Sequence, residues 1–544
     1  MDFLDIALNF MNLYKIPRVT TEFFMKDNDY HAFCIFKEPW MKRKIVIGTL
    51  LGLAASMALA AERPNVVFIV VDDLRPELGI YGKDYIKSPN IDRIGKEGLT
   101  FNRAYVQQAV CSPSRTSVMT GARPDTTKVW DLVTHFRKAT PEIVTLGQHF
   151  KNNGYFVQGM GKIFHGGYDD APTWSVPWQT PSAVKYALPE NVALDERLNQ
   201  LKATDKPKRN ASEPLTADGG PSSGVNMRGP AYEGADVPDN TFTDGKVAEL
   251  ATQTLRDMSK KKEPFFLAVG FVKPHLPFVS PKKYWDMYDP TKIELAHNPF
   301  RPIGAPDYAV MYGGELRNYH GIPETSIPPD LARTLKHGYY AGISYTDAQV
   351  GKVLDELDRL NLRKNTIVVL WGDHGWKLGE HDAWTKHTNM EIDTKAPLLI
   401  SAPGMKAVGA KSNAIVEMVD LFPTLADLAS LPLPKHLEGT SFRPLLDKPE
   451  MPWKKVAFSQ YPRTAYVTGG TPLMGYAMVN DRYRIVQWVD RADLTKVVAV
   501  ELYDHLTDPD ENLNIAQRPE HAALLKSMRE QLAAGWKAAK PVVQ

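Results

Sequence analysis

A run of eleven residues from Cys111 to Gly121 combines a thiol, hydroxyls, a proline and an arginine in the order Cys-Ser-Pro-Ser-Arg-Thr-Ser-Val-Met-Thr-Gly. Pro113 is tolerated in the first turn of a helix, and the serines beside it can cap that turn, so the run predicts a helix that begins near Cys111. A helix N-terminus carries partial positive charge, which favours an anion beside the thiol. Arg115 adds a cation with several hydrogen-bond donors. The run therefore predicts a reactive site that binds an anion.

Carboxylates and a histidine follow two apolar runs of strand length. They are Asp72 and Asp73 after residues 65–71, and Asp373 and His374 after residues 366–371. Paired carboxylates repel one another, and a divalent cation relieves that repulsion. The four side chains therefore predict a metal site where two strands end, with calcium or magnesium favoured over zinc, although His374 softens that preference. The alternative interpretation is that the aspartate pair only caps the next helix.

The elements that must position these residues alternate along the chain. Apolar runs predict strands at residues 65–71, 155–160, 265–269, 366–371 and 397–401, and helical patterns lie at 91–97, 141–152, 244–258, 331–360 and 418–430. Buried strands separated by helices predict an α/β fold with a large, doubly wound, mixed but mostly parallel sheet flanked by helices. Ligands of such sheets bind at the carboxyl ends of the strands.

The remaining segments predict long loops and a second, smaller domain. Residues 168–238 and 298–329 are rich in turn-forming residues and are interpreted as insertions, either at the ligand crevice or merely solvated. From residue 451, short alternating strands at 457–461, 475–479, 483–488 and 496–503 and a helix at 521–539 predict a small C-terminal α+β domain with an antiparallel sheet. We expect a catalytic domain at residues 64–450 and this domain at 451–544.

The first 60 residues are interpreted as lying outside the fold. Residues 1–40 show no clear periodicity and are interpreted as a non-native upstream extension. Residues 41–60 have a basic start, an apolar run and the cleavage signature Ala-Leu-Ala, which predict a signal peptide; the alternative is an uncleaved membrane anchor. We therefore expect an exported protein, periplasmic or secreted, without a stable membrane span in the mature chain.

Composition excludes some classes of function. The formal net charge of +2 argues against a nucleic-acid-binding protein. Of the two cysteines, Cys34 precedes the predicted cleavage site, so an exported chain keeps Cys111 alone and has no disulfide. This isolation favours a chemical role for Cys111, whereas the alternative is a lone buried thiol.

The run at Cys111 resembles the signature of the sulfatases, which is Cys-x-Pro-Ser-Arg, two further residues, two apolar residues, a small polar residue and Gly. Every position of the signature matches. In that family, part of the alkaline phosphatase superfamily, the Cys is oxidised before folding to formylglycine, whose hydrated aldehyde supplies a nucleophilic oxygen. The resemblance therefore implies that Cys111 is a precursor, that a formylglycine-generating enzyme is a maturation partner, and that the converted residue completes the metal site.

The match looks closest to the iduronate-2-sulfatase branch, in which the last metal ligand is His, here His374. This branch usually binds calcium, so Ca²⁺ is expected before Mg²⁺. By resemblance, the diol is contacted by Lys162 and His165, and the sulfate by His275 and Lys386. We assign His275 as the general acid for the leaving alcohol and His165 as the base that clears the sulfated diol. The metal and the cations Arg115, Lys162 and Lys386 are expected to neutralise the sulfate.

The resemblance implies hydrolysis of sulfate monoesters, with a sulfated glycan as the substrate. Two alternatives stay open at this stage. The first is a phosphoester or phosphonate monoester hydrolase of the same superfamily. The second is a noncatalytic protein that binds sulfated glycans and in which Cys111 is never oxidised.

Overall fold

The computed structural model describes residues 63–204, 228–311 and 314–541 of the chain. The predicted upstream extension (residues 1–40) and the predicted signal peptide (residues 41–60) lie outside these ranges. Within the described ranges, no helix has both the length and the apolar character needed to span a membrane.

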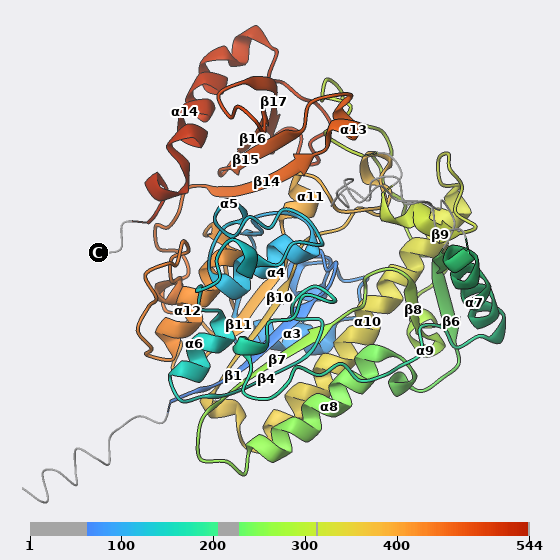
Figure 1. Ribbon diagram of the computed structural model, residues 1–544, viewed down its shortest axis with the longest axis vertical. Coiled ribbons are helices and arrows are strands. Elements are labelled where there is room, and N and C mark those ends of the chain that lie inside the picture. Colours follow the sequence, from blue (N-terminus) through green and yellow to red (C-terminus); the bar gives the residue numbers. More distant parts are fainter. Residues whose placement is uncertain (1–62, 205–227, 312–313, 542–544) are drawn as a thin grey trace, which may run out of the picture. The chain divides into compact units, whose positions relative to one another are not determined.

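A seven-stranded sheet is the centre of the fold (Figure 1), with the strand order β12-β2-β11-β10-β1-β7-β4. Strands β10, β1, β7 and β4 are parallel, β11 is antiparallel to β10 and β2, and β12 is parallel to β2. The strands are β1 (Asn65–Val71), β2 (Leu99–Phe101), β4 (Phe156–Gly161), β7 (Phe265–Phe271), β10 (Thr366–Gly372), β11 (Leu398–Ser401) and β12 (Ala410–Ser412). The predicted mixed, mostly parallel sheet is confirmed.

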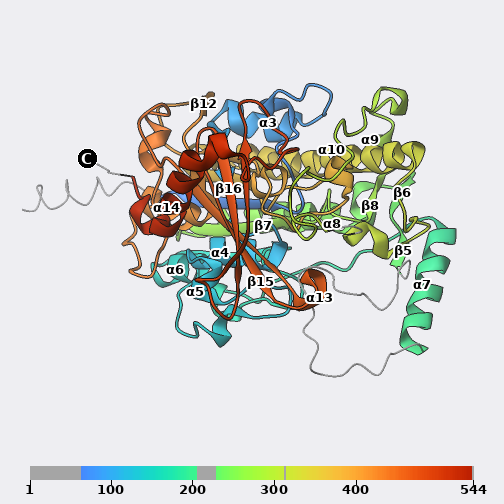
Figure 2. The same cartoon turned by 90° about the horizontal axis from the view of Figure 1, so that it is seen from above.

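Helices cover both faces of this sheet, which is why β1 is apolar from Val66 to Val71 and buried along its whole length. Val66 and Phe68 face a core shared with α4 (Cys111–Thr120), α6 (Leu146–Asn152) and α12 (Leu421–Leu428). Val67 and Ile69 face the opposite core, shared with α3 (Pro89–Lys96), α8 (Thr243–Met258) and α10 (Pro329–Arg359). Figure 2 shows α3 and α10 on one side of the sheet and α4 and α6 on the other.

The C-terminal part forms a second sheet of four antiparallel strands in the order β14-β15-β16-β17. They are β14 (Ala457–Arg463), β15 (Leu473–Val479), β16 (Tyr483–Asp490) and β17 (Val497–Asp504), and α14 (Ala522–Ala538) packs on them through Met528. The predicted antiparallel sheet is confirmed. The described residues from Arg63 onward form one compact unit, and a domain boundary at residue 451 stays a prediction.

The first predicted insertion contains a helix that the sequence pattern does not reveal. Helix α7 (Pro189–Thr204) lies inside the segment expected to be irregular. Its residues, mostly Ala, Leu, Glu, Gln, Lys and other good helix formers, favour a helix by propensity, but their apolar side chains do not gather on one face. The expectation of little regular structure at residues 168–238 was therefore wrong for α7, because it relied on turn-forming composition and the lack of periodicity and left helix propensity aside.

Short elements complete the described chain. Two parallel strand pairs hold the insertions. β5 (Arg228–Pro230) with β9 (Tyr319–His320) joins the two insertions to each other, and β6 (Tyr232–Ala235) with β8 (Phe278–Pro281) joins the first insertion to the rest of the fold. The others are β3 (Ala104–Tyr105), β13 (Val416–Glu417), α5 (Pro124–Thr127), α9 (Lys282–Trp285), α11 (Glu391–Thr394) and α13 (Ala465–Thr468).

Candidate active site

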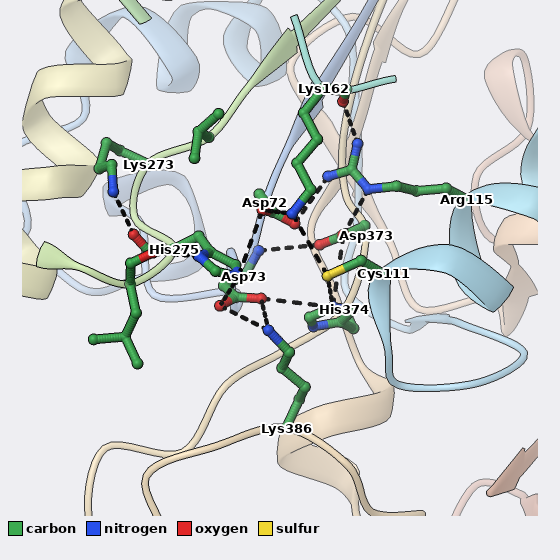
Figure 3. Close-up of polar contacts among 12 residues, drawn as sticks. Asp72, Asp73, Cys111, Arg115, Lys162, Lys273, His275, Asp373, His374 and Lys386 are labelled. Carbon is green, nitrogen blue, oxygen red and sulfur yellow. Dashed lines mark hydrogen bonds and ion pairs between the residues drawn. The ribbon is translucent and has the colours of Figure 1, made fainter. Parts of the chain in front are cut away.

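The two predicted metal-binding segments meet because β1 and β10 are parallel neighbours whose last residues, Val71 and Gly372, lie side by side. The next residues therefore emerge together at the carboxyl edge of the sheet. The backbone N–H of Asp73 donates a 3.0 Å hydrogen bond to Oδ1 of Asp373. Asp73 has a left-handed backbone (φ 56°), and the hydroxyl of Tyr339 on α10 donates to its carbonyl oxygen at 2.7 Å. This turn directs both strand ends into one site (Figure 3).

Four buried side chains form a cluster with the geometry of a cation site. One ligand atom each from Asp72, Asp73, Cys111 and His374 lies within 4.8 Å of all the others. Burial, and after it the neighbouring carboxylates, raises the pKa of Asp73 well above its usual value despite the opposing charge of Lys386. Crowded carboxylates of this kind, with an imidazole, fit a divalent cation.

Asp373 lies at the edge of this cluster. Its Oδ2 accepts a 2.8 Å hydrogen bond from Nε of Arg115 and lies 3.6 Å from Nε2 of His374. Its Oδ1 is already bonded to the N–H of Asp73. Asp373 therefore fixes the turn after β10, and its role as a metal ligand stays a prediction.

Helix α4 begins at Cys111, as predicted, but the predicted serine cap is wrong. The N-cap residue is Val110, whose side chain makes no capping hydrogen bond. The hydroxyl of Ser114 instead donates to the carbonyl oxygen of Asp373, because the helix start is buried against the end of β10. Ser114 therefore connects α4 to the residues that follow β10.

Arg115, one turn along α4, is completely buried between carboxylates and carbonyl groups. Its Nη2 lies 3.0 Å from Oδ1 of Asp72, its Nε binds Asp373, and its Nη1 donates to the carbonyl oxygens of Lys162 and Ile163. The guanidinium thus contributes positive charge to the site while it holds the carboxylates in place.

The thiol of Cys111 points into the cluster (Figure 3). Its Sγ lies 3.3 Å from Nε2 of His374 and 3.7 Å from Nζ of Lys162. Burial, and then the charge of Asp72, raises the pKa of this thiol well above its ordinary value. Because the thiolate is the nucleophilic form, the unmodified Cys111 is a poor nucleophile here.

Two lysines flank the cluster on opposite sides. Lys162, which follows β4, forms an ion pair with Asp72, and Lys386 lies 2.9 Å from Oδ1 of Asp73 and 2.9 Å from Oε2 of Glu315. Burial alone would lower the pKa of both ammonium groups, but the adjacent carboxylates outweigh it and raise both values. Both lysines are therefore charged at neutral pH.

The predicted acid and base, His275 and His165, are both neutral in this arrangement. Burial lowers the pKa of His275 to about 3, and its Nε2 lies 3.5 Å from Oε1 of Glu315 and 3.8 Å from Oδ2 of Asp73. Burial, and then the charge of Lys162, lowers the pKa of His165 to about 3. The buried Nδ1 of His165 has no hydrogen-bond partner among the described residues. A neutral imidazole with an unpartnered nitrogen is able to accept a proton.

Glu315 is a site residue that sequence reasoning missed. It lies in the second predicted insertion, yet its carboxylate contacts Lys386 and His275 and lies 3.3 Å from Nη1 of Arg228. The charge of Lys386 is the largest of several that overcome burial and hold the pKa of Glu315 well below its usual value. No periodicity or motif marks this residue, because contacts made by a loop leave no repeating pattern in the sequence.

Comparison with known proteins places this site in a family. The sulfatase family profile matches residues 64–431, and the profile for the C-terminal part of N-sulphoglucosamine sulphohydrolase matches residues 379–538. Iduronate 2-sulfatase of Mus musculus is 34% identical, over 90% of this chain and 99% of the relative.

Two solved structures share the fold at lower identity. One is a protein in complex with its substrate D-glucosamine-2-N,6-O-disulfate, with a TM-score of 0.65, 19% identity and coverage of 87% of this chain and 99% of that one. The other is the phosphonate monoester hydrolase of Silicibacter pomeroyi, with a TM-score of 0.67, 22% identity and coverage of 88% and 96%. The family match spans most of the described chain and includes every residue of the buried cluster, so this protein belongs to the sulfatase family of enzymes, the sulfuric ester hydrolases.

Proposed function

We propose that this chain hydrolyses sulfate monoesters on a sulfated carbohydrate, with a formylglycine made from Cys111 as the nucleophile. The observation that carries the proposal is the position of the Cys111 Sγ, 3.3 Å from His374 and 3.7 Å from Lys162 within a cluster of potential metal ligands. The name of the mouse relative, iduronate 2-sulfatase, supports a sulfated uronic acid as the sugar.

Asp72, Asp73, His374 and the converted Cys111 are the residues that we expect to hold the metal, with Asp373 as a further ligand. Their oxygen-rich donor set favours Ca²⁺, with Mg²⁺ second. When bound, the cation supplies positive charge that polarises the nucleophile and the sulfate oxygens.

The cations of the site are suited to hold the sulfate group. Lys162 and Lys386 are charged and lie on either side of the cluster, and Arg115 adds charge through its bonds to Asp72 and Asp373. Donors fixed before the reaction stabilise developing negative charge without reorganisation, and one such donor is typically worth about 3 kcal/mol.

Formylglycine in its hydrated form supplies a hydroxyl oxygen for attack on sulfur, and its second hydroxyl allows sulfate to leave by C–O cleavage with the aldehyde restored. His275 is our choice for the proton donor to the leaving alcohol oxygen, which takes the electron pair of the broken S–O bond. Its Nε2 faces the carboxylates of Glu315 and Asp73, which stabilise the protonated form, and an incoming sulfate adds to that effect.

His165 is our choice for the base that removes the remaining hydroxyl proton. Its low pKa keeps it neutral, and its Nδ1 lacks a partner among the described residues. A base in this state needs no prior deprotonation at neutral pH.

The proposed maturation follows from the chemistry of Cys111. A formylglycine-generating enzyme is the proposed partner, because oxidation of a buried, protonated thiol requires access before folding is complete. We further propose export to the periplasm or outside the cell, in keeping with the predicted signal peptide.

The deciding experiment combines released sulfate with the chemical state of Cys111. We expect sulfate release from a panel of defined sulfated oligosaccharides, and a mass for the Cys111 peptide that corresponds to formylglycine. Matched aryl sulfates and aryl phosphates form the control pair. Faster turnover of the phosphate favours the phosphoester hydrolase, and an unmodified thiol in protein from the native host, with no sulfate released, favours the noncatalytic alternative.

A further inference from the structure

A cavity of about 840 Å³ lies beside the catalytic cluster, and none of the predicted catalytic or metal-binding residues lines it. Its walls come from residues 75–87, residues 287–298, the first half of α10, residues 380–395 and residues 509–511. Its volume is in the range of sites that bind small ligands. Arg75, only two residues after Asp73, separates the cavity from the turn that carries the metal ligands.

Lys336 of α10 provides a buried cation without a partner in this wall. Its side chain is 6% exposed, and within the described ranges it donates no hydrogen bond and forms no ion pair. Its ammonium lies 5.9 Å from the ring centre of Tyr340. Burial lowers the pKa of Lys336 from its usual value. An ammonium that donates no hydrogen bond within the described residues is available as a strong, charge-assisted donor to an anionic group that enters the cavity.

Two further polar groups of the wall are buried without partners. Asn298 is 1% exposed and His381 is 2% exposed, and within the described residues neither Oδ1 of Asn298 nor Nδ1 of His381 has a hydrogen-bond partner. The two residues are neighbours, since the N–H of His381 donates to the carbonyl oxygen of Asn298 at 2.8 Å. Both atoms are closed to solvent, so they belong to the packed part of the wall and are not in reach of a ligand in the cavity.

The opposite part of the wall is aromatic and basic. The rings of Tyr85 and Tyr288 lie 5.6 and 5.7 Å from that of Tyr340, and all three line the cavity. Lys83 and Lys87 at the rim are exposed and form no ion pair within the described chain. Tyrosine rings offer flat apolar faces with polar edges, which suit the faces of sugar rings.

Four acidic side chains of the wall pair with arginines, two carboxylates to each guanidinium. Glu77 and Glu380 both pair with Arg75, at 2.5 and 2.8 Å. Glu391 and Glu511 both pair with Arg484, at 2.5 and 2.6 Å. One guanidinium cannot balance two carboxylates, so each of these groups keeps one negative charge. On the side of the tyrosines, Lys83, Lys87 and Lys336 outnumber the one charge left at Glu77 and Glu380, so this side favours an anion.

We propose that this cavity is a second carbohydrate site, separate from the catalytic centre, that binds an acidic segment of an oligosaccharide. Lys336 binds the acidic group, and the tyrosines pack against a sugar ring. The assignment of a sulfated or carboxylated glycan rests on the proposed function.

The test uses the full chain with Cys111→Ala, which removes turnover, and measures binding by calorimetry. The probes are sulfated uronic-acid oligosaccharides from disaccharide to octasaccharide, their desulfated forms, their carboxyl-reduced forms, and inorganic sulfate alone. The cavity variant is Lys336→Met, which keeps the length of the side chain and removes its charge. The matched control is Lys364→Met, an exposed lysine that does not line the cavity.

We expect Lys336→Met to weaken binding of the longer probes about tenfold, which corresponds to about 1.4 kcal/mol, and Lys364→Met to leave it unchanged. Loss of binding on desulfation identifies sulfate as the anion, and loss on carboxyl reduction identifies the carboxylate. Equal affinity of the Lys336→Met and Lys364→Met chains for every probe overturns the proposal, as does binding of inorganic sulfate alone as tight as that of the oligosaccharides.

Turnover separates this proposal from the proposed function. In the chain that retains Cys111, Lys336→Met should leave hydrolysis of a small aryl sulfate unchanged. If the parent chain releases no sulfate from any ester, the proposed function fails, while the binding comparison still decides the cavity. If Lys336→Met lowers aryl sulfate turnover and melting temperature together, Lys336 supports the fold through Arg75 and the carbohydrate site is rejected.

Discussion

Nη2 of Arg115 lies 3.0 Å from Oδ1 of Asp72, and neither side chain is exposed to solvent. Through this bond and the 2.8 Å bond to Asp373, α4 connects the ends of β1 and β10. Arg115, which lies one helical turn after the predicted nucleophile, therefore aligns the carboxylates of Asp72 and Asp373. This alignment requires the planar guanidinium group, whose N–H donors point in several fixed directions. Lysine has no such group.

Substitution Arg115→Lys tests this alignment. We expect it to lower the free energy of unfolding by about 3–5 kcal/mol, because one ammonium cannot pair with both buried carboxylates. Bound metal per chain should fall as well, since Asp72 loses its fixed orientation. Urea unfolding and elemental analysis measure the two effects.

The matched control is Arg93→Lys, at a surface pair with Asp355 whose carboxylate side chain is 69% exposed. Exposed pairs contribute about 0–1 kcal/mol, so this change should have little effect on either measurement. Equal losses in the two variants contradict the role given to Arg115.

Removal of divalent metal should destabilise the protein more strongly as the pH rises. Without a cation, burial and neighbouring carboxylates raise the pKa of Asp73 in the folded state above its unfolded value. The folded state then binds the extra proton, so its stability is greatest at low pH and falls as the pH rises through the folded pKa.

Added Ca²⁺ replaces that proton, and the difference in melting temperature between calcium-loaded and chelated protein should therefore widen as the pH rises above the ordinary pKa of an aspartate. Differential scanning calorimetry at several pH values measures it, with Mg²⁺ as the comparison ion. A difference that narrows over this range is inconsistent with a cation at Asp73.

The strands and the helix that carry the site could be predicted from the sequence because they follow local patterns of residue types. The continuous apolar run of β1 indicates a strand buried on both faces, and the acidic residues that follow β1 and β10 must then meet at one edge of the sheet. The helix start at Cys111 also follows from local preferences. These features depend on neighbours in the sequence or on the general geometry of parallel sheets.

Other features depend on contacts between distant segments and leave no local pattern. Ser114 is a good capping residue by type, yet its hydroxyl binds the carbonyl oxygen of Asp373, 259 residues away. Glu315 comes from a segment without periodicity, and α7 forms from helix propensity without an apolar face. Tertiary packing determines the contacts of such residues, and the sequence alone does not reveal which distant residue will be the partner.

Glu315 should act as a positioning residue for Lys386 and His275, which it contacts at 2.9 and 3.5 Å. In Glu315→Gln, we expect kcat for a sulfate ester to fall about tenfold or more, because Lys386 loses one of its two carboxylate partners and the protonated form of His275 loses a stabilising charge. The melting temperature should fall as well, because the buried ammonium of Lys386 keeps only Asp73 as a partner, so kcat is compared at a temperature at which the variant is fully folded. Steady-state kinetics and the pH profile of kcat check this, with Glu324→Gln, an exposed residue of the same insertion, as the control.

If kcat of Glu315→Gln is lower at every pH but depends on pH in the same way as in the parent chain, Glu315 acts through Lys386 alone. Loss of the limb of the profile that reports the general acid supports the contact with His275. Unchanged kcat in Glu315→Gln contradicts both roles.

Glu511 should make the C-terminal sheet sensitive to acid. Burial opposes its charge, but Arg484 at 2.6 Å and His505 at 2.8 Å outweigh it and lower the pKa of Glu511 to about 2. Because the folded pKa lies below the unfolded value, this carboxylate stabilises the fold above about pH 4.5 and loses its contribution as the pH falls from there toward about 2.

Glu511→Gln should therefore cost about 3–5 kcal/mol near neutral pH, since it leaves a buried guanidinium with one partner fewer. The cost should shrink in acid, so urea unfolding at about pH 7 and pH 3 gives the comparison. Glu520→Gln, an exposed residue close in sequence, should show no cost at either pH, and a cost for Glu511→Gln that grows in acid contradicts the assignment.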